Sequence, residues 1–272
     1  MPDQPPSSSS SSRDTATMNR KIHAHVPYPL LSESLDRILR ERINPEVYFS
    51  CEALDAFTAE RLTESASRLR EAGLNTTIHA AFMDLNPGAT DVTIREATRK
   101  RFEQVFQAAE ILGPRVIVFH PGLDELRHGN SRTAWLRHSI DFWQGLLPRA
   151  TAIGSIIAVE NIFEKEPSSL RDLLEAIDSP SFRHCFDVGH WNMFSTVGLE
   201  EWFAELGSFM AEIHLHDNFG QADEHLPLGE GEIDFDQLFD LLDSFAPEAV
   251  LTIEAHSNER LERSLKNIQK YL

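Results

Sequence analysis

The stretch AEIHLHDNFGQADEHLPLGEGEIDF, residues 211–235, holds the pattern that decides the fold. Its first six residues form a short apolar run that ends in imidazoles, and ligand-type side chains follow closely: His214, His216, Asp217, Asp223 and His225. A loop with so many nitrogen and oxygen ligands is costly to desolvate unless a cation lies among them. A solvated, histidine-rich loop is the alternative. The rest of the chain argues against that alternative, because the same pattern recurs.

Short apolar runs alternate with amphipathic runs from Lys21 onward. The apolar runs predict eight strands: Ile22–His25, Glu46–Phe49, Thr76–His79, Val116–His120, Ile156–Glu160, Phe182–Asp187, Glu212–His216 and Val250–Glu254. Helical spacing lies between them, as in Arg101–Leu112 before Gly113, in Phe235–Leu242, and from near Ser257 onward. Eight strand–helix units predict an α/β protein with a single-domain (β/α)8 barrel, whose active site lies at the C-terminal ends of the strands. An open doubly wound sheet is the alternative fold, although no Gly-rich phosphate loop follows the first strand.

Composition fits one large α/β domain. The chain has 272 residues, 41% of them hydrophobic, and a formal net charge of −18, which makes general binding to nucleic acid unlikely. Two cysteines and the lack of an apolar run of ~18 residues predict a cytoplasmic protein that does not span a membrane. Residues 1–19, rich in Pro and Ser, are expected to be a disordered tail before a folded domain at 20–272, with Met18 as an alternative start.

Ligand-type side chains recur where the predicted strands end. From the third strand to the eighth they are His79, His120, Glu160, Asp187, His214 and Glu254, with His190, Asp223 and His225 in the loops that follow. In a barrel these strand ends meet at one mouth. A single strand-end histidine is usually a hydrogen-bonded core residue, and a single carboxylate is often a helix cap. Several carboxylates buried in one mouth without a cation would be strongly unfavourable, which predicts a metal site.

The segments that carry these residues resemble the xylose isomerase-like TIM-barrel superfamily, which includes sugar isomerases, sugar epimerases and endonuclease IV. The matching segments are IHAAFMDLNPG (78–88), VFHPG (118–122), VENIFE (159–164), CFDVGH (185–190), IHLHD (213–217), DEHLPLGEG (223–231) and TIEA (252–255). Each is short, but their order and spacing cover most of the chain. The resemblance implies a TIM barrel over residues 20–272.

The resemblance implies two possible ligand sets. Sugar epimerases of the superfamily hold one divalent metal, here on Glu160, Asp187, His214 and Glu254. Endonuclease IV-like enzymes hold three zinc ions, and that arrangement would use the same four residues together with His79, His120, His190, Asp223 and His225, with Glu160 bridging two of the ions. The cofactor is accordingly one Mn²⁺, Co²⁺ or Mg²⁺, or up to three Zn²⁺.

Two activities follow from these sets. The first is a metal-dependent isomerase or epimerase of a small sugar or sugar phosphate. It would work through a metal-stabilised enediolate with Glu160 and Glu254 as the catalytic acid–base pair, while His120, His190, His216, Phe82 and Trp191 would contact substrate. The second is a zinc phosphoesterase, either an abasic-site endonuclease or a hydrolase of small phosphodiesters. A metal- or sugar-binding barrel without activity is the third reading.

The apolar residues between 135 and 143 leave one further question open. Trp135, Leu136, Ile140, Phe142 and Trp143 are too apolar for a solvated helix face, so they form either an interface or part of the core. The sequence does not predict an oligomeric state.

Overall fold

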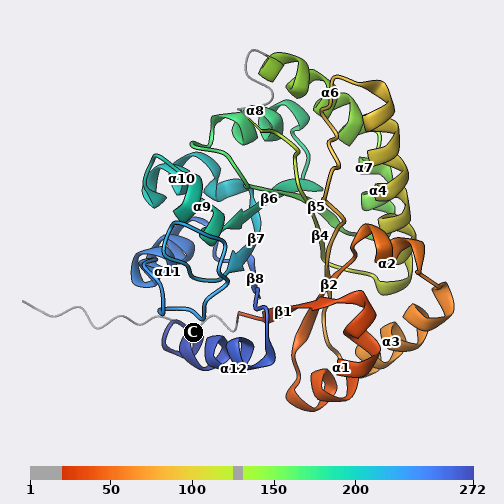
Figure 1. Cartoon of the computed structure of the whole chain (residues 1–272), viewed down its shortest axis with the longest axis vertical. Helices are drawn as coiled ribbons and strands as arrows, with labels where there is room; N and C mark the ends of the chain where they lie inside the picture. Colours follow the sequence, from red (N-terminus) through yellow and green to blue (C-terminus); the bar gives the residue numbers. More distant parts are fainter. Residues whose placement is uncertain (1–19, 125–130) are drawn as a thin grey trace, which may run out of the picture.

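Eight parallel strands close into a barrel in the computed structural model, which describes residues 20–124 and 131–272 (Figure 1). Each strand pairs with the next along the chain, and β1 pairs with β8. The strands are β1 Ile22–Pro27, β2 Asn44–Tyr48, β3 Thr77–His79, β4 Val116–Phe119, β5 Ile156–Glu160, β6 Phe182–Asp187, β7 Met210–Leu215 and β8 Val250–Ile253. The predicted single-domain TIM barrel is confirmed, and the open doubly wound alternative is wrong because β1 and β8 are hydrogen-bonded to each other.

Helices follow the strands and form a ring around the barrel (Figure 1). They are α1 Tyr28–Glu41, α2 Cys51–Asp55, α3 Ala59–Glu71, α4 Val92–Leu112, α6 Arg132–Gln144, α7 Leu147–Ile153, α8 Ser168–Ile177, α9 Val188–Phe194, α10 Leu199–Leu206, α11 Phe235–Phe245 and α12 Asn258–Asn267, with short 3-10 turns at Gly207–Phe209 and Ile268–Lys270. Gly113 ends α4 with φ +66°, as its sequence position predicts, and the Ser257 side chain accepts the Arg260 N–H at the start of α12.

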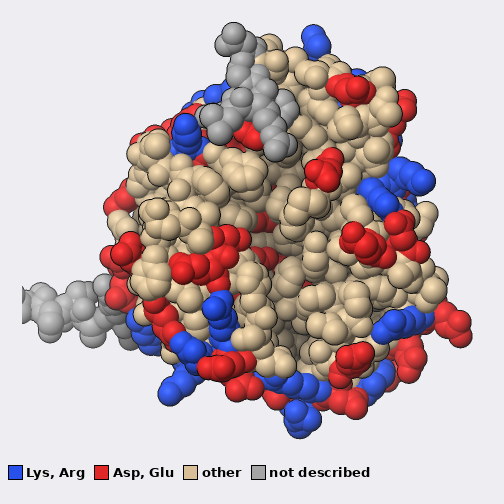
Figure 2. Space-filling view, in the orientation of Figure 1, with Lys and Arg blue, Asp and Glu red and all other residues tan. Residues whose placement is uncertain are grey.

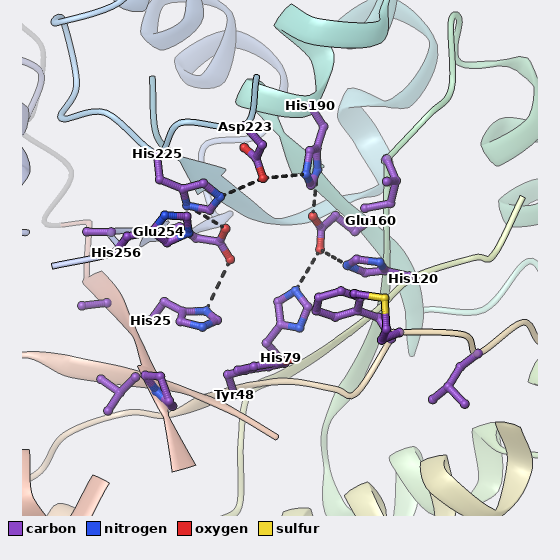
Figure 3. A pocket seen from close by; sticks show the side chains of 18 of the residues that line it. His25, Tyr48, His79, His120, Glu160, His190, Asp223, His225, Glu254 and His256 are labelled. Carbon is purple, nitrogen blue, oxygen red and sulfur yellow. Dashed lines mark hydrogen bonds and ion pairs between the residues drawn. The ribbon is translucent and has the colours of Figure 1, made fainter. Parts of the chain in front are cut away.

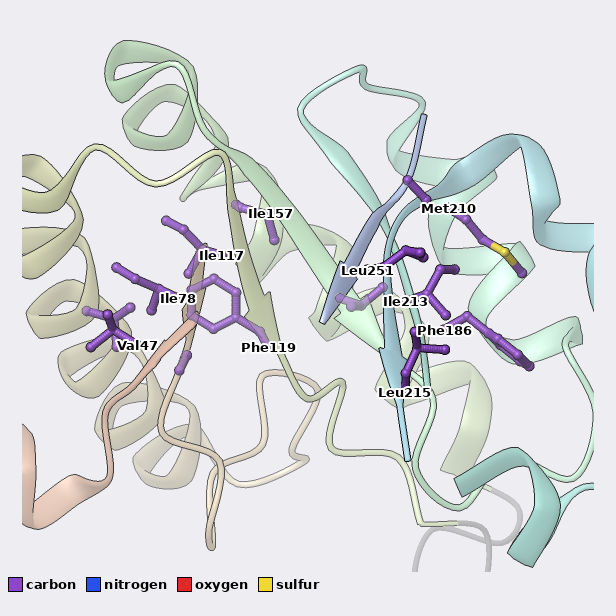
Figure 4. Close-up of a cluster of buried hydrophobic side chains, with 14 of the residues drawn as sticks. Val47, Ile78, Ile117, Phe119, Ile157, Phe186, Met210, Ile213, Leu215 and Leu251 are labelled. Atoms are coloured by element: carbon purple, nitrogen blue, oxygen red, sulfur yellow. The ribbon is translucent and has the colours of Figure 1, made fainter. Parts of the chain in front are cut away.

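The main core lies between the outer face of the barrel and the helices. Strand side chains of that face alternate with those that point inward, and Figure 4 shows Val47, Ile117, Phe186 and other members of this layer. The helix after β4 belongs to the same core, because Trp135 and Trp143 are fully buried in it. Core packing therefore accounts for the apolar residues of that helix.

The barrel interior is apolar in one part and polar in the other. A small separate cluster inside the barrel contains Val116, Val118, Ala158, Cys185 and Val250. Other inward positions carry buried polar residues, namely His23, Glu46, Thr77, Glu212, His214 and Thr252. Removing polar groups from water costs free energy, so each group of this buried polar layer needs a hydrogen-bond or ion-pair partner.

Two predictions concern features away from the barrel. The expected disordered tail at 1–19 and the alternative start at Met18 lie outside the described residues. Within residues 20–124 and 131–272, no helix is both long enough and apolar enough to cross a membrane.

Candidate metal centre

The C-terminal ends of the strands open into a cavity of about 1470 Å³. Figure 2 shows a hollow near the middle of this face, with acidic side chains in its depth and Lys and Arg side chains around the outer edge. Figure 3 shows that imidazole and carboxylate groups from different strand ends point toward one another inside it. The residues predicted at the strand ends therefore share one mouth, as barrel geometry requires.

The first group of side chains surrounds Nδ1 of His214. This atom lies 3.3 Å from Glu254 Oε1, 3.6 Å from Glu160 Oε2 and 3.8 Å from Asp187 Oδ2. The four residues come from β5, β6, β7 and the residue after β8, and each is nearly or fully buried. They are the four residues that the resemblance assigns to a single divalent metal.

A second group shares Glu160 with the first. His79 Nε2 lies 3.2 Å and His120 Nε2 lies 3.4 Å from Glu160 Oε2. The Nδ1 of His79 lies 3.0 Å from the carbonyl oxygen of Ala80, so Nδ1 carries the proton in the neutral ring and Nε2 offers its lone pair to the cavity. Glu160 is thus placed between two groups of imidazoles.

A third group gathers around Asp223. Its Oδ2 lies 2.9 Å from His225 Nε2 and 3.7 Å from His190 Nε2, and its Oδ1 lies 3.7 Å from His216 Nδ1. His190 Nδ1 lies 3.1 Å from the carbonyl oxygen of Asn161, so Nε2 is the nitrogen that would offer a lone pair to a cation. The nine residues predicted as ligands therefore fall into three adjoining groups.

These spacings fit a cation better than they fit direct hydrogen bonds. Two ligands of one tetrahedral zinc, each about 2.0–2.1 Å from it, lie about 3.3 Å apart. The separations around Glu160 Oε2 and His214 Nδ1 are 3.2–3.8 Å. Both atoms are buried and make no hydrogen bond to a described residue, although ion-pair partners lie within 4 Å of each. Side chains that converge on a common point in this way can hold a divalent cation, and histidine and carboxylate donors suit zinc or manganese.

Local backbone geometry supports the first and third groups. The Asp187 side chain accepts the His190 backbone N–H at 2.6 Å and so begins α9, which fixes the spacing of two predicted ligands. Gly189 follows at a position where a Cβ atom would overlap the imidazole of His216. His216 Nε2 lies 3.1 Å from Asp187 Oδ2, so this histidine braces a ligand carboxylate.

The loop after β7 is anchored by Asp217. Its carboxylate accepts the backbone N–H groups of Gly229, Gly231 and Ile233 at 2.8–3.2 Å. A short antiparallel bridge joins Asp217 to Leu226. This closed loop carries Asp223 and His225 back over the mouth. The Gly-Glu-Gly sequence provides two of the backbone N–H groups that Asp217 accepts.

Charges within the mouth compensate one another. Burial by itself would raise the pKa of Glu160, but the imidazoles of His120 and His214 outweigh burial and hold this pKa well below its usual range. Burial would lower the pKa of His25, yet its contacts with Glu254 and Glu46 raise it to about 9. Positive charge is therefore favoured among these carboxylates, in agreement with the choice of ligands.

The predicted substrate contacts occupy different places. His120, His190 and Phe82 line the cavity, and the Phe82 ring stacks on His120 at 4.2 Å between centroids. His216 is fully buried beneath the cavity wall, where it contacts Asp187. Trp191 packs against the core and donates its indole N–H to the Val197 carbonyl, so the cavity wall does not include it.

Three residues in the mouth or directly behind it were not predicted from the sequence: His25, Glu46 and His256. His25 Nδ1 lies 3.3 Å from Glu46 and 3.4 Å from Glu254, and the His256 ring stacks on His225 at 4.1 Å. The sequence signal that could have revealed them is the alternation of inward and outward side chains along a strand. His23 and His25 in β1 and Glu46 in β2 occupy the inward positions.

Comparisons with known proteins agree with this architecture. A sequence model described as xylose isomerase-like TIM barrel matches residues 46–271. The uncharacterized protein MJ1311 of Methanocaldococcus jannaschii is 29% identical over 205 residues, which are 72% of this chain and 69% of that one.

Two solved structures share the fold at 24% identity and a TM-score of 0.77, and each covers 92% of this chain. One is a D-tagatose 3-epimerase-like protein, of which 96% is covered. The other is TTHB071 from Thermus thermophilus, soaked with ZnCl2, of which 97% is covered. Because the family model spans most of the chain, this protein belongs to the xylose isomerase-like TIM-barrel family.

Proposed function

We propose that this protein is a divalent-metal-dependent isomerase or epimerase of a small sugar. One observation carries the proposal. Of the four residues in the first group, Glu160 and Glu254 line the cavity, whereas Asp187 and His214 lie fully buried behind it. Two carboxylates therefore reach the cavity, one from the end of β5 and one from the residue after β8, and such a pair can remove and return a proton at a carbon atom.

The two glutamates supply the proton chemistry. A bound divalent cation would supply Lewis-acid stabilisation of the negative charge that develops on the substrate oxygens. One carboxylate accepts the proton from the carbon next to the carbonyl group, and the C–H electron pair becomes the double bond of an enediolate. The other glutamate takes up a proton from solvent and gives it to the opposite face of that carbon, which yields an epimer, while the first glutamate returns its proton to solvent. Delivery of the proton to the neighbouring carbon, together with transfer of a proton between the two substrate oxygens, yields an isomer. His25 holds Glu254 in place at 3.4 Å.

The lining of the cavity favours an uncharged sugar over a sugar phosphate. Among the described residues that line it, Arg37 is the single Lys or Arg side chain. Its guanidinium already pairs with Glu41 and Glu262, each at 3.0 Å. A phosphate would therefore lack a free Lys or Arg side chain within this part of the chain.

A trinuclear zinc phosphoesterase is the second candidate, because one specific observation favours it. The groups around His79 and around Asp223 have ligand-like spacing that a single metal on the first group would leave unused. Clustered metals would polarise phosphoryl oxygens and stabilise the leaving oxygen. In that chemistry Glu160 and Glu254 would act as ligands only.

Metal analysis on protein purified without chelator, followed by assays, tests both candidates. About one Mn²⁺, Co²⁺ or Mg²⁺ per chain with interconversion of a ketose supports the first candidate, and about three Zn²⁺ with cleavage of abasic DNA or a small phosphodiester supports the second. Glu160→Gln should lower kcat by about 10²–10⁴-fold with the fold retained. The matched control is Glu248→Gln, an exposed glutamate before β8. Full turnover by Glu160→Gln would refute both candidates.

A further inference from the structure

Glu46 is a buried carboxylate that neither proposed reaction uses. It lies in the middle of β2, with its side chain inside the barrel and no exposed surface. A buried carboxylate is unfavourable unless it is well partnered. Its partners are two imidazoles: Oε1 lies 3.3 Å from His25 Nδ1, and Oε2 lies 3.3 Å from His214 Nε2. Glu46 is thus held by the layer of side chains directly behind the candidate metal centre.

The two nitrogens of His214 face different surroundings. Nε2 contacts Glu46, whereas Nδ1 faces the carboxylates of Glu160, Asp187 and Glu254 and makes no hydrogen bond to a described residue. A neutral imidazole carries one N–H group. An acidic partner at Nε2 favours the tautomer with the proton there and leaves the Nδ1 lone pair directed at the cation position.

We propose that Glu46 is the positioning residue of the metal centre: it accepts the Nε2–H of His214 and so fixes the ring orientation and tautomer that present Nδ1 to a divalent cation. The same carboxylate accepts from His25, which lines the cavity and contacts Glu254. Glu46 therefore connects a cavity-facing histidine to the metal-facing one without reaching the cavity itself.

The chain offers a matched control in Glu212. This glutamate is equally buried inside the barrel, on β7, where it accepts the Thr252 hydroxyl and also contacts Glu46. Burial and the nearby charge of Glu46 raise the pKa of Glu212 well above its usual range. Glu212→Gln and Glu46→Gln each replace one buried glutamate of the same layer by its amide. Of these two glutamates, Glu46 is the one that contacts the proposed ligand His214. Because Glu212 is thereby held as the uncharged acid, its amide preserves the charge of the layer, whereas Glu46→Gln removes the charge that faces His214. The two variants therefore separate a general effect on the barrel interior from a specific effect on His214.

Metal affinity tests the proposal without any substrate. Dissociation constants for Zn²⁺ and Co²⁺ would be measured by chelator competition on the full chain, together with the visible spectrum of the Co²⁺-loaded protein. Glu46→Gln should weaken binding by about 10–100-fold and change the Co²⁺ spectrum, since loss of an outer-shell partner of a ligand has this effect. Glu46→Asp should recover part of the affinity, and Glu212→Gln should stay within about twofold of the wild type. Wild-type affinity in a folded Glu46→Gln variant would overturn the proposal.

Nitrogen-15 NMR of the wild-type protein loaded with Zn²⁺ gives a test that needs no variant. The expected pattern for His214 is a protonated Nε2 and a metal-bound Nδ1, and a metal-bound Nε2 would overturn the proposal. The inference rests on the proposed metal centre and not on the sugar chemistry. Metal binding that depends on Glu46 in a protein with no ketose activity would refute the proposed function alone, whereas a wild type that binds no divalent metal would refute both.

Discussion

Replacement of His184 by Asn should flatten the dependence of stability on pH. His184 lies on β6 on the outer side of the barrel, fully buried beside Trp202 of α10. Its Nδ1 lies 2.8 Å from the Val159 carbonyl oxygen, and its Nε2 has no partner among the described residues. Burial lowers the pKa of this histidine to about 4, and the hydrogen bond to Val159 only partly opposes that effect.

The magnitude follows from the two protonation equilibria. In the unfolded chain the group has its ordinary pKa of 6.5, so below that pH the unfolded state binds a proton that the folded state excludes. The stabilisation is fully present above pH 6.5 and is lost as the pH falls toward 4. At 1.36 kcal/mol per pH unit, the loss between pH 7.5 and pH 5 is about 2 kcal/mol.

Urea unfolding at pH 7.5 and pH 5, with EDTA present to remove cation binding, measures this loss. An Asn amide can donate to the Val159 carbonyl but does not titrate. The wild type should therefore lose about 2 kcal/mol more of its free energy of unfolding than His184→Asn over this interval. All other ionisable groups are common to the two proteins, so their contributions cancel in the comparison. Identical losses in the two proteins would refute the reasoning.

Three further predictions concern the mouth of the barrel. Gly189→Ala should lower the free energy of unfolding by about 1–3 kcal/mol and weaken metal binding, because the new methyl group displaces His216 from Asp187. Thermal unfolding and chelator competition measure the two effects, and an unchanged metal affinity would contradict this account. Asp217→Ala should leave four backbone N–H groups of the loop without their acceptor and cost about 3 kcal/mol or more. Hydrogen exchange over residues 218–233 should then be faster than in the wild type, and unchanged exchange there would argue against Asp217 as the anchor. Zn²⁺ at 100 times its dissociation constant should raise the free energy of unfolding by about 2.7 kcal/mol, and EDTA should reverse this rise. A melting temperature that Zn²⁺ leaves unchanged would contradict a metal site in the native state.

The barrel could be predicted from sequence because its signal is repeated. Each of the eight predicted strands corresponds to an observed one, and the predicted bounds of Ile156–Glu160 and Phe182–Asp187 match the observed strands. Errors occur at the ends, as in β1, which continues to Pro27 beyond the predicted His25. The final residue of a strand depends on pairing with its neighbours, which a single segment does not encode.

The convergence of the mouth residues also followed from topology, because strand ends of a barrel meet whatever their sequence. The position of Glu46 in the buried polar layer inside the barrel could not be predicted in this way. Glu46 stood at the start of its predicted strand, where a carboxylate has an ordinary solvated explanation, and its proximity to His214 depends on how β2 and β7 face each other across the barrel. His216 and Trp191 could not be placed by spacing alone, because residues at a strand end or on a short helix turn can face either the cavity or the core.

Two neighbouring side chains after the end of β7 contact different parts of the protein. His216 points to Asp187, whereas Asp217 holds the loop that carries Asp223 and His225. A movement that lifted this loop would separate Asp223 from His190 and His225 from Glu254. The loop is therefore unsuited to open and close for the entry of substrate. Met83 and Phe163 line the cavity from the segments after β3 and β5 and are 66% and 47% exposed, so small molecules that enter beside them would leave the loop after β7 undisturbed.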